Sequence, residues 1–169
     1  MDTKTVSFTG INTKYQIKKI VGGPKNPKTR SKWVEPEGGN VSHETQLHAM
    51  SDISNNPLYS KEISSKLGGY RNQDILKNHY DPNLFVTFTQ TVHLLVECEL
   101  SCFYCKEFTP ILFKNVRDSK QWSLDRINND IGHHYGNVVI SCLKCNLQKK
   151  RMSSSAFAMS KQMILTRVE

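Results

Sequence analysis

The pattern of apolar residues predicts a helix that begins after Thr87. Phe88, Val92 and Leu95 recur at helical spacing, and the threonine before them is a suitable N-cap. The β-branched and aromatic residues at 85–89 would also suit a strand. The apolar period is closer to 3.6 than to 2, so we expect the helix, which would lead directly into a pair of cysteines.

Further upstream, turn residues divide the chain into shorter elements. The sequence Asn55-Asn56-Pro57 predicts the start of a helix, which would stop at Gly68-Gly69. Residues 71–80 predict a second short helix that ends before Asp81-Pro82. Such a pair of helices can dock on DNA, although packing within the fold is its commoner role. Residues 1–56 are polar and rich in turn residues, so we expect an irregular region there.

Short apolar runs predict β-strands in the second half of the chain, at Ile111–Phe113, Trp122–Leu124 and Val138–Ile140. The last two would face each other across a polar loop. A helix would open at Cys142, and another short helix would begin near Ser153. Together these elements predict an α+β fold.

Length and charge narrow the range of functions. The chain of 169 residues indicates about one domain, with a basic N-terminal region at 1–56 and the remaining elements at 57–169. Its formal net charge of +8 suits a polyanionic partner, most simply nucleic acid. No apolar stretch approaches the ~20 residues that a membrane span needs. The first residues contain no apolar signal run, so we expect an intracellular protein without a signal peptide.

A group of cations lies in the N-terminal region. Lys28, Arg30 and Lys32 stand close to Trp33 in the sequence. This segment could form an arm that binds phosphates through its cations and adds an aromatic contact. A solvated loop is the alternative. As an arm, the segment would add non-specific, salt-dependent affinity for DNA.

Four cysteines occur in two pairs of the form Cys-x-x-Cys. The first pair is Cys102 and Cys105, and the second is Cys142 and Cys145. Each pair can present two thiolates from one tight turn, and four sulfurs at about 2.3 Å complete a tetrahedral zinc site. Disulfide bonds are the alternative, but they suit an exported chain. We therefore expect one structural zinc ion on these four residues, and Cys98 as a buried thiol outside the site.

The residues between and around these pairs resemble a known nuclease motif. Ser123-Leu-Asp-Arg-Ile-Asn-Asn-Asp-x-Gly-His is followed by Asn137-Val-Val and then by Cys142-x-x-Cys-Asn-x-x-Lys149. This string resembles the His-Asn-His (HNH) endonucleases, in the zinc-stapled Asp-Arg-Ile form found in phages and large DNA viruses. The resemblance covers about 87–151, and residues 68–74 are also similar to sequence that precedes this module in members from large viruses.

This resemblance implies a ββα-metal module, in which a strand, a loop, a strand and a helix hold a metal ion. It implies a viral or phage enzyme that acts in the host cell on DNA, hydrolysing phosphodiester bonds by nicking or by cutting both strands. Asp125 and Asn146 would bind a catalytic Mg²⁺ or Mn²⁺, which polarises the phosphate and holds the leaving oxygen. Asn137 matches the residue that buttresses the loop and positions the general base.

Arg126 departs from the common motif, which has a histidine here as the general base. An arginine cannot deprotonate water near neutral pH. It can bind the scissile phosphate or neutralise charge in the transition state. His133 and His134 are the nearest candidates for the base. The alternative is a degenerate site, in a zinc-stabilised protein that binds nucleic acid or serves a structural role.

Cations gather around the predicted last helix, beside Asn146. A solvated helix face is one interpretation, but the adjacency favours contacts with the phosphates that flank the cut. We expect these DNA contacts from Lys144, Lys149, Lys150 and Arg151.

Overall fold

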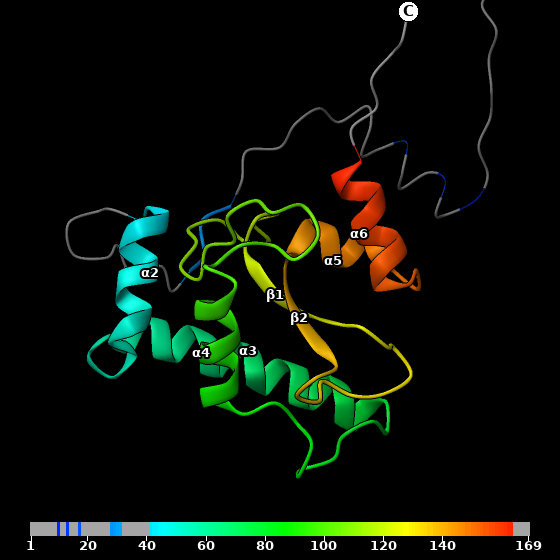
Figure 1. Ribbon diagram of the computed structural model, residues 1–169, viewed down its shortest axis with the longest axis horizontal. Coiled ribbons are helices and arrows are strands. Elements are labelled where there is room, and N and C mark those ends of the chain that lie inside the picture. Colours follow the sequence, from blue (N-terminus) through cyan, green and yellow to red (C-terminus); the bar gives the residue numbers. More distant parts are fainter. Residues whose placement is uncertain (1–9, 11–12, 14–16, 18–27, 32–40, 164–169) are drawn as a thin grey trace, which may run out of the picture.

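A two-stranded sheet lies at the centre of the fold, with α3 and α4 on one side and α5 and α6 on the other (Figure 1). The structure is a computed structural model that describes residues 10, 13, 17, 28–31 and 41–163. The chain is mixed α+β, as the sequence predicts. In chain order the elements are α2 His43–Ser51, the 3₁₀ turn η1 Ile53–Asn55, α3 Pro57–Leu76, α4 Phe88–Glu97, β1 Trp122–Arg126, β2 Val138–Cys142, α5 Leu143–Lys149 and α6 Ser154–Gln162.

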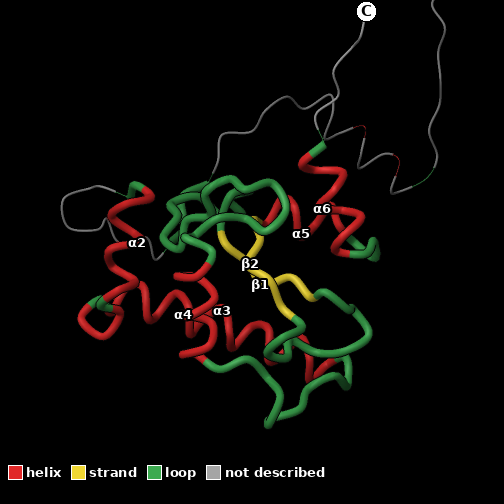
Figure 2. Tube along the Cα trace, viewed as in Figure 1, coloured by secondary structure: helices red, strands yellow, loops and turns green. Residues whose placement is uncertain are grey.

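β1 and β2 pair antiparallel, with Trp122 opposite Cys142 and Arg126 opposite Val138. The pairing confirms the two strands predicted at 122–124 and 138–140. A long loop at 127–137 connects them and has neither helix nor strand of its own (Figure 2). The order strand, loop, strand, helix therefore matches the order of elements that the sequence predicts.

Side chains from neighbouring helices close the outer edge of β1. Tyr70 of α3 accepts a hydrogen bond from the Leu124 amide at 3.0 Å, and Asn146 of α5 donates to the Leu124 carbonyl at 3.1 Å. Lys66 and Lys149, from the same two helices, donate to carbonyls at the two ends of the strand. A two-stranded sheet alone is marginally stable in water. These contacts therefore hold β1 and fix the positions of α3 and α5 beside it.

One continuous helix, α3, replaces the two short helices predicted on either side of Gly68-Gly69. Glycine weakens a helix through backbone entropy. Here Tyr59, Ile63 and Leu67 form one buried stripe, and both glycines lie on the exposed face. Packing of the stripe outweighs the local cost, and the helix is long enough to carry Asp74 to the loop between the strands.

Replacing Gly68 with alanine is expected to stabilise the protein by about 0.5–1 kcal/mol. A Cβ atom at this position would meet no atom within 4 Å, so no clash offsets the gain in helix propensity. Urea unfolding should show a higher midpoint with an unchanged slope. Gly132→Ala is the contrasting control, because its Cβ would lie 2.4 Å from the His79 carbonyl oxygen and should destabilise the fold. A lower midpoint for Gly68→Ala would show that α3 needs a glycine there.

Two predicted segments differ in the structure. Residues 111–113 do not form a strand but run as a buried irregular segment. The side-chain oxygen of Gln46 takes the place of a partner strand, because it accepts hydrogen bonds from the Ile111 and Leu112 amides at 2.8 and 3.0 Å. Gln46 belongs to α2, a helix within the region that the sequence predicts to be irregular. Helix α2 packs against α4.

The main core lies between α2, α3, α4 and the sheet and includes Ile63, Leu95 and Trp122, all fully buried. A second apolar cluster surrounds the cysteines and contains Tyr104 and Phe157. Helix α4 begins at its predicted cap, where Thr87 forms a reciprocal capping box with the third residue of the helix. Among the described residues, none of the helices combines the length and the apolar character that crossing a bilayer would require.

Candidate functional site

The four predicted cysteines come together at the junction of β2 and α5. Their sulfur atoms all lie within 4.8 Å of one another, in Cys102, Cys105, Cys142 and Cys145. The Cys105 and Cys142 sulfurs are 3.9 Å apart. This separation is close to the ~3.8 Å edge of a tetrahedron whose corners lie about 2.3 Å from a central ion. The cluster could therefore hold a metal ion such as zinc.

Two tight turns present these sulfurs. Cys142 ends β2 and caps α5, where its sulfur accepts a hydrogen bond from the Cys145 amide at 3.4 Å. The first turn follows α4 and is joined to the sheet by a hydrogen bond from the Phe103 amide to the Ile140 carbonyl at 2.8 Å. Burial raises the pKa of Cys145 to about 12, because close, desolvated sulfurs resist carrying several negative charges. A divalent cation among them would supply the compensating charge.

Tyr104 connects the cysteine cluster to Asp125 of β1. It lies within the turn from Cys102 to Cys105 and is fully buried. Its hydroxyl donates to Oδ2 of Asp125 at 2.5 Å. Burial, followed by this hydrogen bond, raises the pKa of Tyr104 above its ordinary value, so the tyrosine remains a donor at neutral pH. The turn that carries two of the sulfurs therefore also orients the carboxylate.

Lys149 is buried beside the same carboxylate, although the sequence predicts that it contacts DNA. The residue is 0% exposed, and its Nζ lies 3.2 Å from Oδ2 of Asp125. It also donates to the Arg126 carbonyl at 2.6 Å. The prediction is wrong because Lys149 lies one helical turn after Cys145, on the face of α5 that points inward. Its ammonium group balances the charge of Asp125 and has no access to a phosphate on the surface.

Asp125 and Asn146 each have one oxygen without a hydrogen-bond partner among the described residues. The hydrogen bond and the ion pair of Asp125 both reach Oδ2, and no bond to Oδ1 is found in the described part of the chain. Asn146 Nδ2 donates to Ser123 Oγ and to the Leu124 carbonyl, each at 3.1 Å. Because the Leu124 carbonyl can only accept, the group of Asn146 that faces it must be the NH₂ group. The amide oxygen of Asn146 is therefore the atom that remains available. One carboxylate oxygen and one amide oxygen suit Mg²⁺, which binds few protein oxygens and keeps several waters.

Asp125 and Asn146 both line a small cavity of about 260 Å³. Its lining comes from three parts of the chain that are distant in sequence: α3, β1 with the loop that follows it, and α5. Of the residues predicted for catalysis and for the second metal, the cavity brings together Asp125, Arg126, His133 and Asn146.

His133 is held on one side so that one ring nitrogen remains available. Its Nδ1 lies 2.8 Å from Oδ1 of Asp74, and its backbone amide donates to Oδ2 of the same carboxylate at 2.6 Å. The Tyr70 ring packs against the imidazole, with 4.6 Å between ring centroids. A carboxylate accepts, so the proton sits on Nδ1 and the lone pair is on Nε2. Burial lowers the pKa of His133, although Asp74 opposes the shift, and the ring is therefore neutral near pH 7.

Asp74 belongs to this candidate site, and the sequence reasoning missed it. It is fully buried near the end of α3, in line with the apolar positions Ile63 and Leu67. An acid on the buried stripe of a helix was the available signal, since such a charge needs a partner. Gly132 allows this contact because it has no side chain. A Cβ atom at this position would lie only 2.8 Å from Oδ2 of Asp74.

Asn137 fastens the loop between the strands. Its Nδ2 donates to the carbonyls of Asn128 and Gly132 at 2.9 and 3.0 Å, and its Oδ1 accepts from the Asn128 amide at 2.9 Å. Gly132 precedes His133, so these bonds fix the backbone that carries the imidazole. The contacts agree with the buttressing role that the resemblance implies for Asn137.

Arg126 lines the small cavity and is itself only 9% exposed. Its Nη1 donates to the Ile131 carbonyl at 3.0 Å and lies 3.3 Å from Nδ1 of His79. A phosphate would therefore meet the remaining donors of the guanidinium group. His134 does not line this cavity, and its Nε2 is buried without a hydrogen-bond partner among the described residues.

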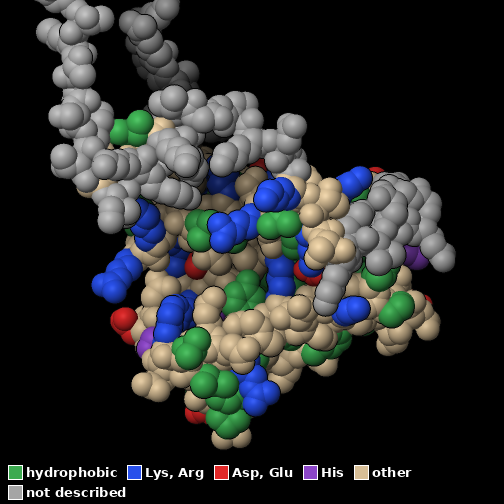
Figure 3. Space-filling view, turned by 180° about the vertical axis from the view of Figure 1, so that it is seen from behind, with side chains coloured by type: hydrophobic (Ala, Val, Ile, Leu, Met, Phe, Trp, Pro, Cys, Tyr) green, Lys and Arg blue, Asp and Glu red, His purple; other side chains and the backbone are tan. Residues whose placement is uncertain are grey.

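The remaining predicted DNA contacts differ in their surroundings. Four of these side chains are exposed to solvent: Lys28, Lys144, Lys150 and Arg151. Arg30 is held within the fold, because it pairs with Glu62 at 2.8 Å and stacks over the Phe113 ring at 4.3 Å. Lys32 lies outside the described residues. Lys and Arg side chains gather across the middle of one face of the molecule, with few acidic side chains between them (Figure 3).

The function of the protein is inferred from the groups that line the small cavity. It combines a buried carboxylate, an amide oxygen and an imidazole whose Nε2 carries the lone pair. Neither a protein-family model nor a curated protein nor a solved structure matches the chain.

Proposed function

We propose that this protein is a metal-dependent HNH endonuclease that hydrolyses phosphodiester bonds of DNA. The four cysteines would hold a structural zinc ion, and Asp125 and Asn146 would hold the catalytic Mg²⁺ or Mn²⁺. The observation that carries the proposal is the convergence of these two residues and His133 on one cavity of a strand–loop–strand–helix unit. A cysteine cluster that only stabilises a fold needs none of these three residues. The net charge of +8 supports DNA as the substrate.

The side chains divide the reaction between them. Nε2 of His133 accepts a proton from the attacking water, while Asp74 holds the ring through Nδ1 and stabilises the imidazolium that forms. Arg126 binds the phosphate through donors other than Nη1 and opposes the charge of the transition state. A divalent ion, when bound, polarises the phosphate and stabilises the leaving oxygen. Tyr104 and Lys149 hold Asp125 in position for that ion.

One observation favours a second function, a zinc-stabilised protein that binds nucleic acid without cutting it. The Lys149 ammonium lies 3.2 Å from Oδ2 of Asp125 and already balances this carboxylate, which reduces its need for a metal ion. The contact between Asp74 and His133 argues for the enzyme, because a binding module has no use for an imidazole aligned by a buried acid.

Purified protein is expected to nick or linearise supercoiled plasmid with Mg²⁺ or Mn²⁺, and a chelator should stop the reaction. The rate should rise with pH, because protonated imidazole has no lone pair with which to accept a proton. Burial lowers the pKa of His133, so the rise should be centred below the ordinary value of about 6.5 and level off above it. Initial rates measured between about pH 5 and pH 8 would test this profile.

His133→Ala and His134→Ala form a matched pair for the same assay. The first variant should lose about 10²-fold or more in rate, the usual contribution of a general base, with DNA affinity little changed. The second should keep most of its activity, because its ring does not line the small cavity. Cleavage by His133→Ala at the parental rate would remove His133 from the mechanism. If the parent protein binds DNA but cuts none with either metal, the second function, binding of nucleic acid without cleavage, would be the remaining proposal.

A further inference from the structure

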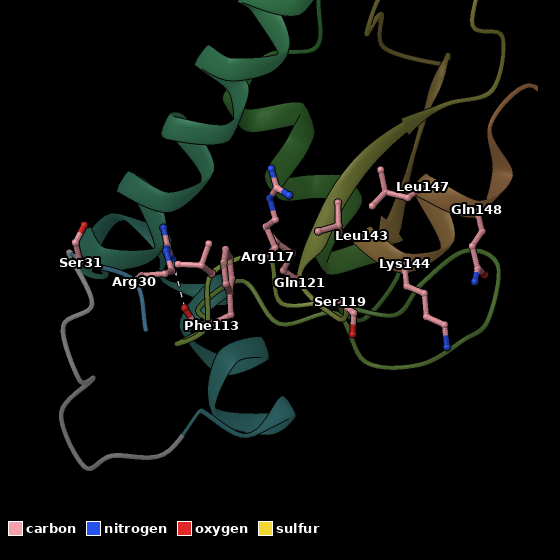
Figure 4. Close-up of a pocket in the computed structure, with 11 residues that line it drawn as sticks. Arg30, Ser31, Phe113, Arg117, Ser119, Gln121, Leu143, Lys144, Leu147 and Gln148 are labelled. Carbon is pink, nitrogen blue, oxygen red and sulfur yellow. Dashed lines mark hydrogen bonds between the residues drawn. The ribbon is translucent and has the colours of Figure 1, made fainter. Parts of the chain in front are cut away.

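A larger cavity, of about 1000 Å³, adjoins the small one. Its volume is at the upper end of the range of about 300–1,000 Å³ that is typical of ligand sites. Leu143 and Leu147 of α5 line both cavities, so the two spaces are neighbours. In the view of Figure 4, Arg30 and Phe113 lie toward one end of the larger cavity and Lys144 toward the other.

The apolar part of this lining is partly exposed to solvent, and Phe113 within it is buried. Phe113, Val116, Leu143 and Leu147 contribute to it. Leu147 is 65% exposed and Val116 is 50% exposed. Neighbouring exposed apolar side chains in a hollow indicate contact with an apolar surface of a partner.

The charged part of the lining is wholly basic. Arg30, Arg117 and Lys144 line the cavity, and no acidic residue does among those described. Arg30 is already ordered, since it donates to the Phe113 carbonyl at 3.4 Å in addition to its ion pair with Glu62 (Figure 4). A partner that fits here is therefore anionic at its edge and apolar on its face.

We propose that this cavity binds an unpaired nucleotide of the DNA strand, next to the phosphate that Arg126 would bind in the small cavity. The inference rests on the proposed function and specifies its substrate: DNA with an unpaired stretch beside the cut. An unpaired nucleotide offers a flat base that can lie on the apolar lining and a phosphate for the cations. In a duplex the faces of the bases are stacked, and a protein reaches only phosphates, sugars and base edges. An apolar hollow therefore selects the unpaired strand.

The test compares the binding of fluorescent oligothymidylate with that of a blunt duplex of equal length, using the full chain without added divalent ion. Leu147→Ala should weaken binding of the single strand by roughly tenfold, the loss expected when an apolar side chain that covers the base is truncated, and binding of the duplex by less than about twofold. Lys144→Ala should weaken both, because phosphates are common to both. Met159→Ala is the matched control, since Met159 is 70% exposed on α6 and does not line this cavity.

Equal losses for the two DNA forms with Leu147→Ala, unchanged binding of both, or a parent that binds neither form would overturn the proposal. So would unchanged DNA binding with an altered oligomeric state, which would assign the cavity to a second copy of the chain. Because this test measures binding and not cleavage, a failure of the nucleotide site can be distinguished from a failure of the proposed nuclease activity. A parent that uses Leu147 to bind single strands but never cuts would refute the nuclease and leave the nucleotide site intact.

Discussion

Replacing Asp125 with alanine is expected to lower the rate of DNA cleavage by about 10³-fold or more, while the metal on the four cysteines stays bound. A catalytic metal ion contributes several kcal/mol of charge stabilisation, and each 1.4 kcal/mol, approximately, is a factor of ten in rate. The cysteine sulfurs belong to separate residues and do not depend on this carboxylate as a ligand. Plasmid-cleavage rates and the metal content of the purified variant would be measured together.

The burial of Lys149 makes a second variant necessary. Asp125→Ala alone leaves a buried ammonium without its partner, which costs about 3–5 kcal/mol of stability. A double variant, Asp125→Ala with Lys149→Met, removes the orphaned charge and should recover part of the melting temperature without recovering cleavage. If the double variant regains cleavage together with its melting temperature, Asp125 would be needed for folding and not for the reaction. Cleavage that persists in both variants would assign the chemistry to other residues.

Replacing Cys142 with serine is expected to abolish tight zinc binding and to lower the melting temperature by about 10 °C or more. Cys142 joins the end of β2 to the start of α5, so loss of this ligand loosens the unit that carries the small cavity. Cleavage should disappear along with the metal. Metal analysis and a thermal melt followed by circular dichroism would report both effects.

Cys98→Ser is the control for that experiment. This fifth cysteine is half-buried at the end of α4 and does not belong to the four-sulfur cluster. The variant should keep about one zinc per chain and a melting temperature close to that of the parent. A Cys142→Ser protein that retains its zinc and its melting temperature would rule out the proposed site.

Local patterns in the sequence were sufficient for the elements that depend on neighbouring residues. The cap at Thr87, the strands at 122–126 and 138–142 and the turn at Cys142 follow from residue type and spacing. The continuity of α3 through Gly68-Gly69 depends instead on a buried stripe that only the rest of the fold supplies. Residues 111–113 needed a side chain from α2, which no local pattern reveals.

The candidate site was predictable only in part for the same reason. The resemblance implies Asp125 and Asn146 as metal ligands, and His133 is one of the two histidines nearest to Arg126 in that motif. The partner of His133 is Asp74, which lies 59 residues away in the chain and meets it only in the folded protein. Lys149 could have been predicted correctly, because it follows the buried Cys145 by one helical turn.

The position of Tyr104 has a consequence for when the protein becomes active. The phenol that orients Asp125 belongs to the turn that supplies Cys102 and Cys105. A newly synthesised chain would therefore close that turn around its zinc before the carboxylate takes up its working geometry. Maturation would follow a fixed order, and the supply of zinc would set the moment at which the proposed nuclease activity first appears.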